Sequence, residues 1–380
     1  MAEGSRKKIG ILFNFNGSWL GGVYYVQNII KALNHLEDVD KPEIIIFYKS
    51  ELKQFTENID YPYYSAVQWK FPSIFKGYIK SWILRKNFFI HEITKQYDLK
   101  GIYPLYNHPI TNKATSKTQL VAWFPDLQHK FFPGYFNKLN LLLREIRMKM
   151  ILRNSDKLVV SSLDVKSHFD AFYEVPKKLS IHVLPFVSII DGLVFNNYRE
   201  LKHKYNLPDN FFMISNQFYE HKNHIVVIKA LKILKERNIN AHIVMTGKME
   251  DYRNPEYIKE LKRNITSDIS KMITFLGVIP RQDQLCIMKH SAAVIQPSLF
   301  EGWSTVIEDA KSLNVPVISS DIAIHKEQLT NNGIFFKSSE ASSLAKAIES
   351  FKSKPLIDTN YEKYEDRVLD FAENFVTIFK

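Results

Sequence analysis

The sequence contains a single cysteine, Cys286, among its 380 residues, which excludes an intrachain disulfide. A lone thiol is typical of proteins from reducing compartments, so we expect a cytoplasmic protein. The sequence also lacks any apolar run near the roughly 18 residues that a membrane-spanning helix requires. The segment Met1–Lys8 is polar and basic, and no apolar stretch that resembles a signal peptide follows it.

Acidic residues are fewer than basic ones: 40 Asp and Glu stand against 51 Lys and Arg, which gives a net charge of +11. This excess is compatible with a solvated basic surface, an anionic substrate, an anionic membrane or nucleic acid. The charge is dispersed along the chain and no nucleic-acid-binding motif is present, which disfavours a non-catalytic nucleic-acid binder. Phe75–Phe89 and Lys138–Lys157 mix basic with apolar residues. Each is typical either of an ordinary helix with solvated lysines or of a helix on an anionic membrane.

Short β-branched runs alternate with amphipathic helical stretches along the chain. The first half predicts a helix over 23–36 and strands over 9–15, 43–48, 120–124, 158–162 and 181–184. Continuous apolar runs between helices indicate a parallel sheet buried on both faces. The pattern restarts near Phe211, with helices predicted over 223–236, 255–264, 282–289 and 305–313 and strands over 211–215, 241–246, 272–276, 292–296 and 315–319.

The segment 188–209 carries few strand or helix signals and is the predicted linker. We therefore expect an N-terminal domain over 1–190 and a C-terminal domain over 191–360. A last helix over 361–380 is expected to return to the N-terminal domain. Ligands of open parallel sheets bind beyond the carboxyl ends of the strands, so the loops at those ends are where a site is expected.

The loop from Gln296 to Ala310 follows a predicted strand and opens a predicted helix. Ser304 or Thr305 is a natural N-cap, and the amides and dipole of the helix suit an anion such as a diphosphate. Gly302 allows the backbone to approach a ligand closely. Glu301 and a carboxylate one helical turn later could contact a sugar and a ribose. The alternative is a capped surface helix with acidic residues in its first turn.

This stretch resembles the signature of the retaining glycosyltransferases of family four, in the glycosyl transferases group 1, which have the GT-B fold. That signature is a Glu, seven residues and a second Glu, followed by Ala, a small-residue turn and Pro-Val. Here Glu301 is followed at that spacing by Asp309 and Ala310, and then by 314–317. Asp309 replaces the second Glu. The adjacent Glu308 is rotated by about 100° on a helix, so either carboxylate could hold the ribose.

The stretch Ser215–His224 resembles a second element of the family, again between a strand and a helix. In the family, an Arg and a Lys five residues later hold the donor diphosphate. Lys222 matches that Lys, whereas Gln217 stands in place of the Arg. Because Gln carries no charge, Lys222 and the helix N-terminus have to neutralise more of the diphosphate. His221 and His224 lack an evident third ligand, which disfavours a metal site.

The loops Thr246–Lys248 and Phe275–Pro280 follow the strands between these elements. By resemblance, the second of them holds the nucleotide base through its backbone. Glu301 and Lys222 are the expected catalytic residues of this half. The residues expected to bind the donor are Gly21, Gly22, Asn216, Gln217, Gly247, Val278, Ile279, Gly302, Trp303, Ser304, Thr305, Glu308 and Asp309.

Two loops of the first half complete the prediction. Gly21 and Gly22 do not fit the dinucleotide-binding fingerprint, which weakens a dehydrogenase interpretation. In the family this loop reaches the donor diphosphate, although a plain strand-to-helix turn is the alternative. Family members commonly have His-Asp after a later strand, with the His contacting the donor sugar. Here Pro125 and Asp126 occupy that place and the nearest His is His129. Asp126 is expected to hold an acceptor hydroxyl and His129 to replace the usual His, unless both are structural.

Asp38 and Asp40 superficially resemble the acidic metal-binding pair of the other glycosyltransferase fold. They follow a predicted helix and precede a predicted strand, which places their carboxylates at the wrong edge of the sheet. We interpret them as part of a solvated turn.

Taken with the resemblance, the sequence predicts an α/β protein with the GT-B fold, two Rossmann-like doubly wound parallel-sheet domains facing across a cleft. The resemblance implies a retaining hexosyltransferase that uses a nucleotide-sugar, a UDP-sugar being favoured, and a saccharide or lipid-linked acceptor in bacterial surface polysaccharide synthesis. Glu301 would position the donor sugar, and no metal or other cofactor is expected. A GT-B nucleotide-sugar epimerase is the main alternative. Peripheral contact with the inner face of the cell membrane stays open.

Overall fold

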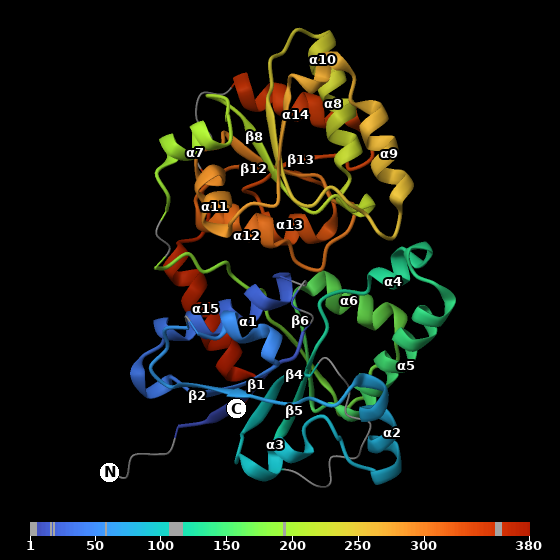
Figure 1. Cartoon of the computed structure of the whole chain (residues 1–380), viewed down its shortest axis with the longest axis vertical. Coiled ribbons are helices and arrows are strands. Elements are labelled where there is room, and N and C mark those ends of the chain that lie inside the picture. The colour runs from blue at the N-terminus through green and yellow to red at the C-terminus, as the bar shows by residue number, and fades with distance from the viewer. Residues whose placement is uncertain are drawn as a thin grey trace. The chain divides into compact units, whose positions relative to one another are not determined.

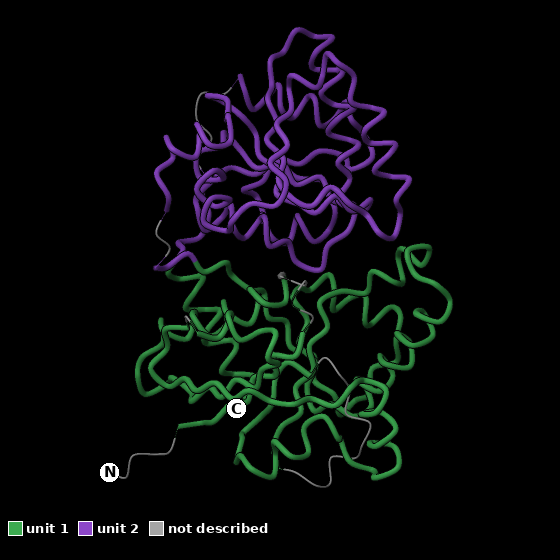
Figure 2. The backbone as a smooth tube through the Cα atoms, viewed as in Figure 1, with its two compact units in different colours: residues 1–189, 365–380 green, residues 190–364 purple. Residues whose placement is uncertain are grey.

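The computed structural model describes residues 6–15, 17, 20–57, 59–105, 117–192, 195–353 and 359–380. The chain divides into two compact units (Figure 2). Unit 1 comprises residues 1–189 and 365–380, and unit 2 comprises residues 190–364. Each unit is built around one parallel sheet with helices on both faces (Figure 1).

The sheet of unit 1 has seven strands in the order β3-β2-β1-β4-β5-β6-β7. All paired strands run parallel. The strands are β1 (Lys8–Phe13), β2 (Glu43–Tyr48), β3 (Tyr64–Gln68), β4 (Gly101–Leu105), β5 (Gln119–Trp123), β6 (Lys157–Val160) and β7 (Ser180–Val183). The helices are α1 (Leu20–Ala32), α2 (Ile74–Leu84), α3 (His91–Gln96), α4 (Gln128–Phe131), α5 (Lys138–Asn154) and α6 (Leu163–Phe172). Strands β1, β2 and β4 are almost wholly buried, as expected for a parallel sheet covered on both faces.

The last helix of the chain, α15 (Tyr364–Thr377), packs in unit 1 rather than beside the segment that precedes it. The ring of Phe375 lies 5.6 Å from that of Tyr103 on β4. Phe379 rests against Gly101, where an added Cβ would lie 2.5 Å from the ring. Lys157 Nζ donates a hydrogen bond to the carbonyl of Ile378. These contacts attach the C-terminus to the centre of the unit 1 sheet.

The sheet of unit 2 has six parallel strands in the order β10-β9-β8-β11-β12-β13, which is the doubly wound order of a Rossmann fold. The strands are β8 (Phe212–Ser215), β9 (Ile243–Thr246), β10 (Ile273–Gly277), β11 (Ala293–Gln296), β12 (Val317–Ser320) and β13 (Ile334–Phe336). The helices are α7 (Tyr198–Lys204), α8 (His224–Glu236), α9 (Pro255–Asn264), α10 (Ser267–Ser270), α11 (Arg281–Lys289), α12 (Thr305–Ser312), α13 (Ala323–Leu329) and α14 (Ala341–Ser353). Helices α8, α9 and α14 cover one face and α7, α11 and α12 the other (Figure 1).

Several element predictions are corrected. The sequence patterns do not predict strands β3, β4 and β13, and β4 is hard to recognise because Pro104 is its fourth of five residues. Helix α7 lies within the predicted linker 188–209. Helix α1 begins at Leu20, so Gly21 and Gly22 occupy its first turn instead of preceding the helix.

Candidate functional site

The loops after β8, β9 and β10 lie side by side at the carboxyl edge of the unit 2 sheet. The amide of Gly247 donates to the carbonyl of Gly277 at 2.9 Å. Gly247 has φ +135°, and a Cβ there would lie 2.0 Å from the carbonyl oxygen of Asn216. Gln217 is exposed, and its Oε1 accepts a hydrogen bond from the amide of Lys248 at 2.9 Å. Only glycine fits at position 247, and it permits this close approach of two loops.

A polar network links the ends of β8 and β11. Glu301 Oε1 accepts hydrogen bonds from Lys222 Nζ at 2.5 Å, Gln296 Nε2 at 2.9 Å and Ser298 Oγ at 2.8 Å. Gln296 is fully buried, and its own Oε1 accepts from Asn216 Nδ2 at 2.8 Å. Lys222 and Glu301 retain 17% and 11% side-chain exposure. The network therefore holds one ammonium and one carboxylate: Gln296 and Ser298 orientate Glu301, Glu301 holds Lys222, and both charged groups keep some exposure.

Lys222 is the last residue of a short 3₁₀-helix, Glu220–Lys222, and its position is fixed by the residue that follows. Asn223 has a left-handed backbone with φ 56°. Its side-chain amide donates to the carbonyls of Pro297 at 3.1 Å and Ser338 at 2.9 Å. The amide of Leu299 donates to the carbonyl of His221 at 2.7 Å. These bonds join the Lys222 turn directly to the loop that carries Glu301.

The N-terminus of α12 is capped within the protein. Ser304 is the N-cap and its Oγ accepts from the amide of Ile307 at 3.4 Å. Gln328 of α13 accepts a hydrogen bond from the amide of Ser304 through its Oε1 at 2.9 Å. Its Nε2 donates to the carbonyl of Ser304 at 3.0 Å. The amide of Ser304 is thus already paired. Because helix N-termini attract anions, the amides at the start of α12, beginning at Thr305, are the candidates for binding one.

The two carboxylates on α12 point to different partners. Asp309 forms a two-pronged ion pair with Arg281, in which Arg281 Nη1 lies 2.6 Å from Asp309 Oδ2. Glu308 Oε1 accepts from Gln328 Nε2 at 3.0 Å and lies 3.4 Å from Lys311 Nζ. Both carboxylates are almost completely buried, whereas Arg281 retains 21% exposure at the start of α11. Asp309 is therefore tied to the first residue of α11 and Glu308 to α13.

The remaining donor-site candidates of unit 2 differ in exposure. Val278 is 67% exposed in the loop after β10, whereas Ile279 beside it packs against the core. Gly302 is buried and Trp303 half-buried in the loop before α12. Val278 therefore exposes an apolar side chain three residues before Arg281.

His221 and His224 are held as neutral imidazoles. Burial, with the charge of Lys222 nearby, lowers the pKa of His221 to about 2 and that of His224 to about 3. The ring of His224 stacks on Phe218 with centroids 4.1 Å apart. A stacked ring inside the core contributes to packing, and the absence of a metal at this pair stays a prediction.

At the carboxyl edge of the unit 1 sheet, the side chains are mainly aromatic. Trp123 at the end of β5 stacks on Tyr25 of α1 with centroids 4.2 Å apart. Asp126 is half-buried, and its Oδ1 accepts from the amide of Gln128 at 2.9 Å. His129 is buried, and its Nε2 lies 3.3 Å from both Tyr173 Oη and Glu145 Oε1. Burial lowers the pKa of His129 to about 4.

The predicted glycine pair of unit 1 lies partly at the surface. Gly21 is exposed and Gly22 is buried in the first turn of α1. Asn16, Ser18 and Trp19 of the preceding loop lie outside the described residues.

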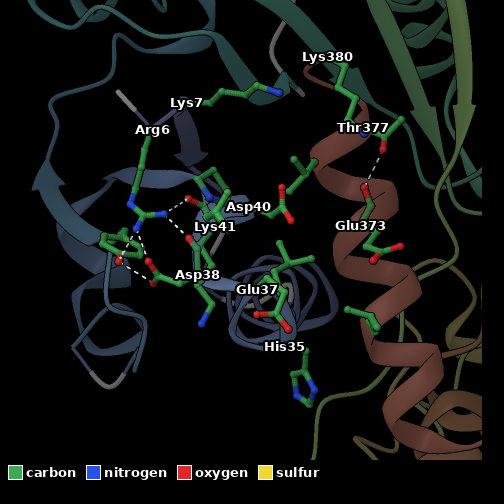
Figure 3. Close-up of a pocket in the computed structure, with 16 residues that line it drawn as sticks. Arg6, Lys7, His35, Glu37, Asp38, Asp40, Lys41, Glu373, Thr377 and Lys380 are labelled. Atoms are coloured by element: carbon green, nitrogen blue, oxygen red, sulfur yellow. Dashed lines mark hydrogen bonds and ion pairs between the residues drawn. The ribbon is translucent and has the colours of Figure 1, made fainter. Parts of the chain in front are cut away.

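Asp38 and Asp40 line a different pocket of unit 1 (Figure 3). This cavity of about 1280 Å³ also contains Arg6 and Lys41, and α15 contributes Glu373. It lies beside the amino ends of β1 and β2, where Asp38 Oδ1 accepts from Tyr63 Oη at 2.7 Å and pairs with Arg6. The pocket is therefore at the edge opposite the strand ends where parallel sheets bind ligands.

Sequence reasoning missed Gln296, Ser298, Gln328 and Arg281. Gln296 is the final residue of β11, and a polar residue ending an apolar run is the signal that could have identified it. No comparable signal exists for Gln328 or Arg281. Their partners lie 24 and 28 residues away in the chain.

Residues 197–368 match the family model described as glycosyl transferases group 1, so this segment carries a glycosyltransferase domain. The chain is 22% identical over 244 residues to the O-antigen chain mannosyltransferase RfbU of Salmonella typhimurium, which covers 64% of this chain. The chain spans 63% of the length of that relative.

Two solved structures resemble the chain along almost its whole length. Sucrose-phosphate synthase of Thermosynechococcus elongatus has a TM-score of 0.66 and 16% identity, covering 98% of both chains. HepE of Anabaena, solved with UDP and glucose, has a TM-score of 0.62 and 16% identity over 97% of this chain and 96% of its own. Together with the two parallel sheets, these likenesses confirm the predicted GT-B fold.

Proposed function

We propose that the protein is a retaining glycosyltransferase of family four that transfers a hexose from a nucleotide diphosphate sugar, with a UDP-sugar favoured. The observation that carries this proposal is the Lys222–Glu301 pair, held at 2.5 Å within a buried amide network at the carboxyl edge of the unit 2 sheet. That network lies inside the segment that matches glycosyl transferases group 1. HepE, a structural neighbour, was solved with UDP and glucose, which supports the choice of base.

Lys222 is assigned to the donor diphosphate. As the bond between the anomeric carbon and the diphosphate oxygen breaks, negative charge grows on the leaving group, and an ammonium group placed there stabilises it. The first amides of α12 and the positive end of its dipole add to this stabilisation. With the charge held by Lys222, the amides and Gln217, the proposed reaction requires no metal ion or other cofactor.

Glu301 is assigned to the donor sugar as a positioning carboxylate and not as a covalent nucleophile. Gln296 and Ser298 both donate to its Oε1, which restricts the orientation of the carboxylate. The acceptor hydroxyl adds to the anomeric carbon on the face from which the diphosphate departs. Its proton passes to the departing phosphate oxygen, so the configuration is retained without a protein base.

Asp309 is assigned to the ribose hydroxyls together with Arg281. The pair joins α12 to the first residue of α11. The loop between β10 and α11 is assigned to the nucleotide base through its backbone at Val278 and Ile279. Glu308 is assigned to holding α12 against α13 through Gln328. Gly247, Asn216, Gly302 and Trp303 complete the donor site.

The acceptor is assigned to unit 1. Trp123 and Tyr25 are buried and stacked on each other, so they support the loop after β5, and the half-buried Asp126 of that loop can accept a hydrogen bond from a sugar hydroxyl. His129 lies beside the same loop and is assigned to supporting it. Gly21 and Gly22 are assigned to the approach of the backbone to the diphosphate. The acceptor class is a saccharide or lipid-linked saccharide of bacterial surface polysaccharide, in line with the name of the relative RfbU.

A thermal-shift panel of UDP, GDP, ADP and their sugars, with and without EDTA, tests this function. A ligand at a hundred times its Kd adds about 2.7 kcal/mol to the free energy of unfolding, which is easily measured. We expect stabilisation by UDP that survives EDTA. Stabilisation by GDP alone would change the donor, and no response to any nucleotide would end the transferase proposal. A product assay without acceptor then separates transfer from epimerisation, because only an epimerase converts the donor alone.

A further inference from the structure

Exposed apolar side chains are concentrated in unit 1. More than half of the large ones in the described chain lie on two helices, α2 and α5: Ile74, Phe75, Ile79, Trp82, Ile83, Leu84, Leu139, Leu142, Leu143 and Ile146. Unit 2 contributes Tyr252, Phe275 and Val278. Scattered exposed apolar residues are ordinary, whereas a concentration of them marks a contact surface.

Helix α2 turns its small residues toward the protein. Gly77 and Ser81 are its buried residues, and a Cβ added at Gly77 would lie 2.3 Å from the ring of Phe89. Phe75 and Trp82 are each 75% exposed. Burial of apolar surface within unit 1 would favour the opposite orientation, with the aromatic rings inside. The exposed face of α2 therefore has an apolar surface that the fold itself does not use.

Helix α5 presents a matching stripe. Its exposed apolar residues recur at helical spacing: Leu139, Leu142, Leu143 and Ile146. Met148 and Ile151 of the same helix are buried in a core cluster, against which Tyr78 of α2 also packs. Both helices therefore cover the same core of unit 1 (Figure 1). Both also expose apolar side chains to solvent.

The charge around both stripes is positive. Between Tyr61 and His91 the chain has no Asp or Glu and five basic residues: Lys70, Lys76, Lys80, Arg85 and Lys86. Helix α5 carries Lys138, Arg144, Arg147, Lys149 and Arg153 against one acidic residue, Glu145. Glu145 is paired with Lys130 at 2.7 Å. The net charge of the two segments is thus complementary to an anionic partner.

A groove beside α2 repeats this combination. It has a volume of about 640 Å³, and its lining includes the aromatic residues Trp69, Phe71 and Phe88 and three lysines, Lys70, Lys76 and Lys80, against one carboxylate, Glu92. Lys80 Nζ lies 4.7 Å from the ring centroid of Phe88. Ammonium groups next to aromatic rings suit a molecule whose phosphate adjoins an apolar part, as in a phospholipid headgroup region.

We propose that α2 and α5 form a docking face for an anionic phospholipid bilayer. The apolar stripes enter the boundary between headgroups and acyl chains, and the lysines and arginines contact the lipid phosphates. Each basic residue near such a surface adds about 1 kcal/mol of attraction. None of the helices in the described segments combines the length and apolar character needed to cross a bilayer, so the contact is peripheral. This proposal does not depend on the proposed transferase activity.

Sedimentation of the full chain with vesicles tests the docking face. We expect binding to vesicles of phosphatidylcholine with phosphatidylglycerol at least tenfold tighter than to phosphatidylcholine alone, and weaker binding at high salt. Because Trp82 is exposed, its fluorescence emission should shift to shorter wavelength on the anionic vesicles. Equal partitioning to both vesicle types, or none to either, would overturn the proposal.

Paired variants locate the face. Trp82→Ser with Ile83→Ser, and separately Leu142→Ser with Leu143→Ser, should each reduce partitioning about tenfold, because a buried side chain of this size contributes about 1.5–3 kcal/mol. Tyr252→Ser, at a comparably exposed apolar position in unit 2, is the matched control and should bind as the wild type does. Wild-type partitioning by both paired variants would contradict the proposal.

Charge variants and two controls complete the design. Lys76→Glu with Lys80→Glu should abolish the preference for anionic lipid, whereas Lys262→Glu with Arg263→Glu on α9 should not. An unchanged melting temperature and nucleotide response show that the variants remain folded. Sedimentation velocity addresses the other occupant, a second copy of the chain. A wild-type dimer that the Trp82 and Ile83 variant converts to monomer would assign the face to self-association and overturn lipid docking.

Discussion

The carboxyl edges of the two sheets carry different chemistry. In unit 2, Lys222, Glu301 and Gln296 are joined by hydrogen bonds of 2.5–2.9 Å across the ends of two strands. In unit 1, the end of β5 carries Trp123 stacked on Tyr25 at 4.2 Å. The first edge carries charges that hydrogen bonds already hold in place, whereas these aromatic rings of the second edge are buried and hold the strand end against α1.

This difference matches the ligands proposed for each edge. A diphosphate is a constant, highly charged group, and stabilising it requires donors that are already orientated. An acceptor saccharide is neutral, and a few hydrogen-bonding groups such as the half-buried Asp126, on a loop supported by buried aromatic rings, suit it. We therefore expect substitutions at the unit 2 edge to change turnover and donor binding, and substitutions at the unit 1 edge to change acceptor binding.

The largest expected effect is that of Lys222→Ala. Loss of the ammonium group removes charge stabilisation of the leaving diphosphate, and kcat should fall about 10²–10³-fold. Thermal melting should change little, because Glu301 keeps its bonds to Gln296 and Ser298. Lys248→Ala, an exposed lysine in the loop after β9, is the control and should retain activity. Near-normal turnover of Lys222→Ala would remove this residue from the site.

Gly247→Ala should have the next largest effect. The added methyl group meets the carbonyl of Asn216 at 2.0 Å, and φ +135° is unfavourable for alanine. We expect a loss of about 2–3 kcal/mol in the free energy of unfolding together with loss of stabilisation by nucleotide. Gly134→Ala in unit 1, where nothing lies within 4 Å of the added Cβ, is the matched control. Wild-type stability of Gly247→Ala would show that the loops tolerate separation.

Asp309→Asn compared with Glu308→Gln tests the ribose assignment. The measurement is the ratio of the Kd values for 2′-deoxy-UDP and UDP. We expect wild type and Glu308→Gln to prefer UDP about tenfold, the effect of one charge-assisted hydrogen bond. Asp309→Asn should lose that preference, since it also weakens the pairing with Arg281. If Glu308→Gln loses the preference instead, Glu308 is the residue that contacts the ribose.

Asp126→Asn and His129→Gln separate binding from support in unit 1. Asp126→Asn should raise the acceptor KM several-fold and leave nucleotide stabilisation unchanged. His129→Gln should lower the free energy of unfolding by about 1–2 kcal/mol, because it disturbs a buried group against Tyr173 and Glu145. A fall in kcat of His129→Gln without loss of stability would assign this residue to the donor sugar.

The smallest expected effect is a difference in acid sensitivity. Burial lowers the pKa of His221, His224 and His325 in unit 2 to between about 2 and 4, and that of His129 in unit 1 to about 4. In the unfolded chain these groups titrate near pH 6.5, so the unfolded state binds more protons below that pH. Their contribution to stability is complete above about pH 6.5 and decreases as the pH falls toward 4.

Hydrogen exchange at pH 7 and pH 5 measures this difference for each unit separately. Unit 2 should lose more protection than unit 1, because it contains more of the strongly shifted histidines. The variant His224→Phe should reduce the acid sensitivity of unit 2. Equal loss of protection in both units would contradict the prediction.

Much of the fold follows from local patterns. Alternating apolar runs and helical periodicity predicted the parallel sheets and most strand positions, because each pattern is contained within about ten neighbouring residues. The missed strands break that pattern: Pro104 interrupts β4, and β13 has only the residues Ile334–Phe336. The placement of Glu301 and Lys222 at strand ends followed from the same reasoning.

The pairing of side chains required the tertiary structure. Gln296 bonds to Asn216 across 80 residues, and Arg281 selects Asp309 over the neighbouring Glu308. Periodicity also could not reveal that α2 buries Gly77 and exposes Trp82. The sequence by itself determined the two parallel-sheet domains and the loops that carry the candidate residues, since these depend on local apolar spacing. Which groups meet was decided only by the strand order and helix packing, because those bring distant segments to the same edge.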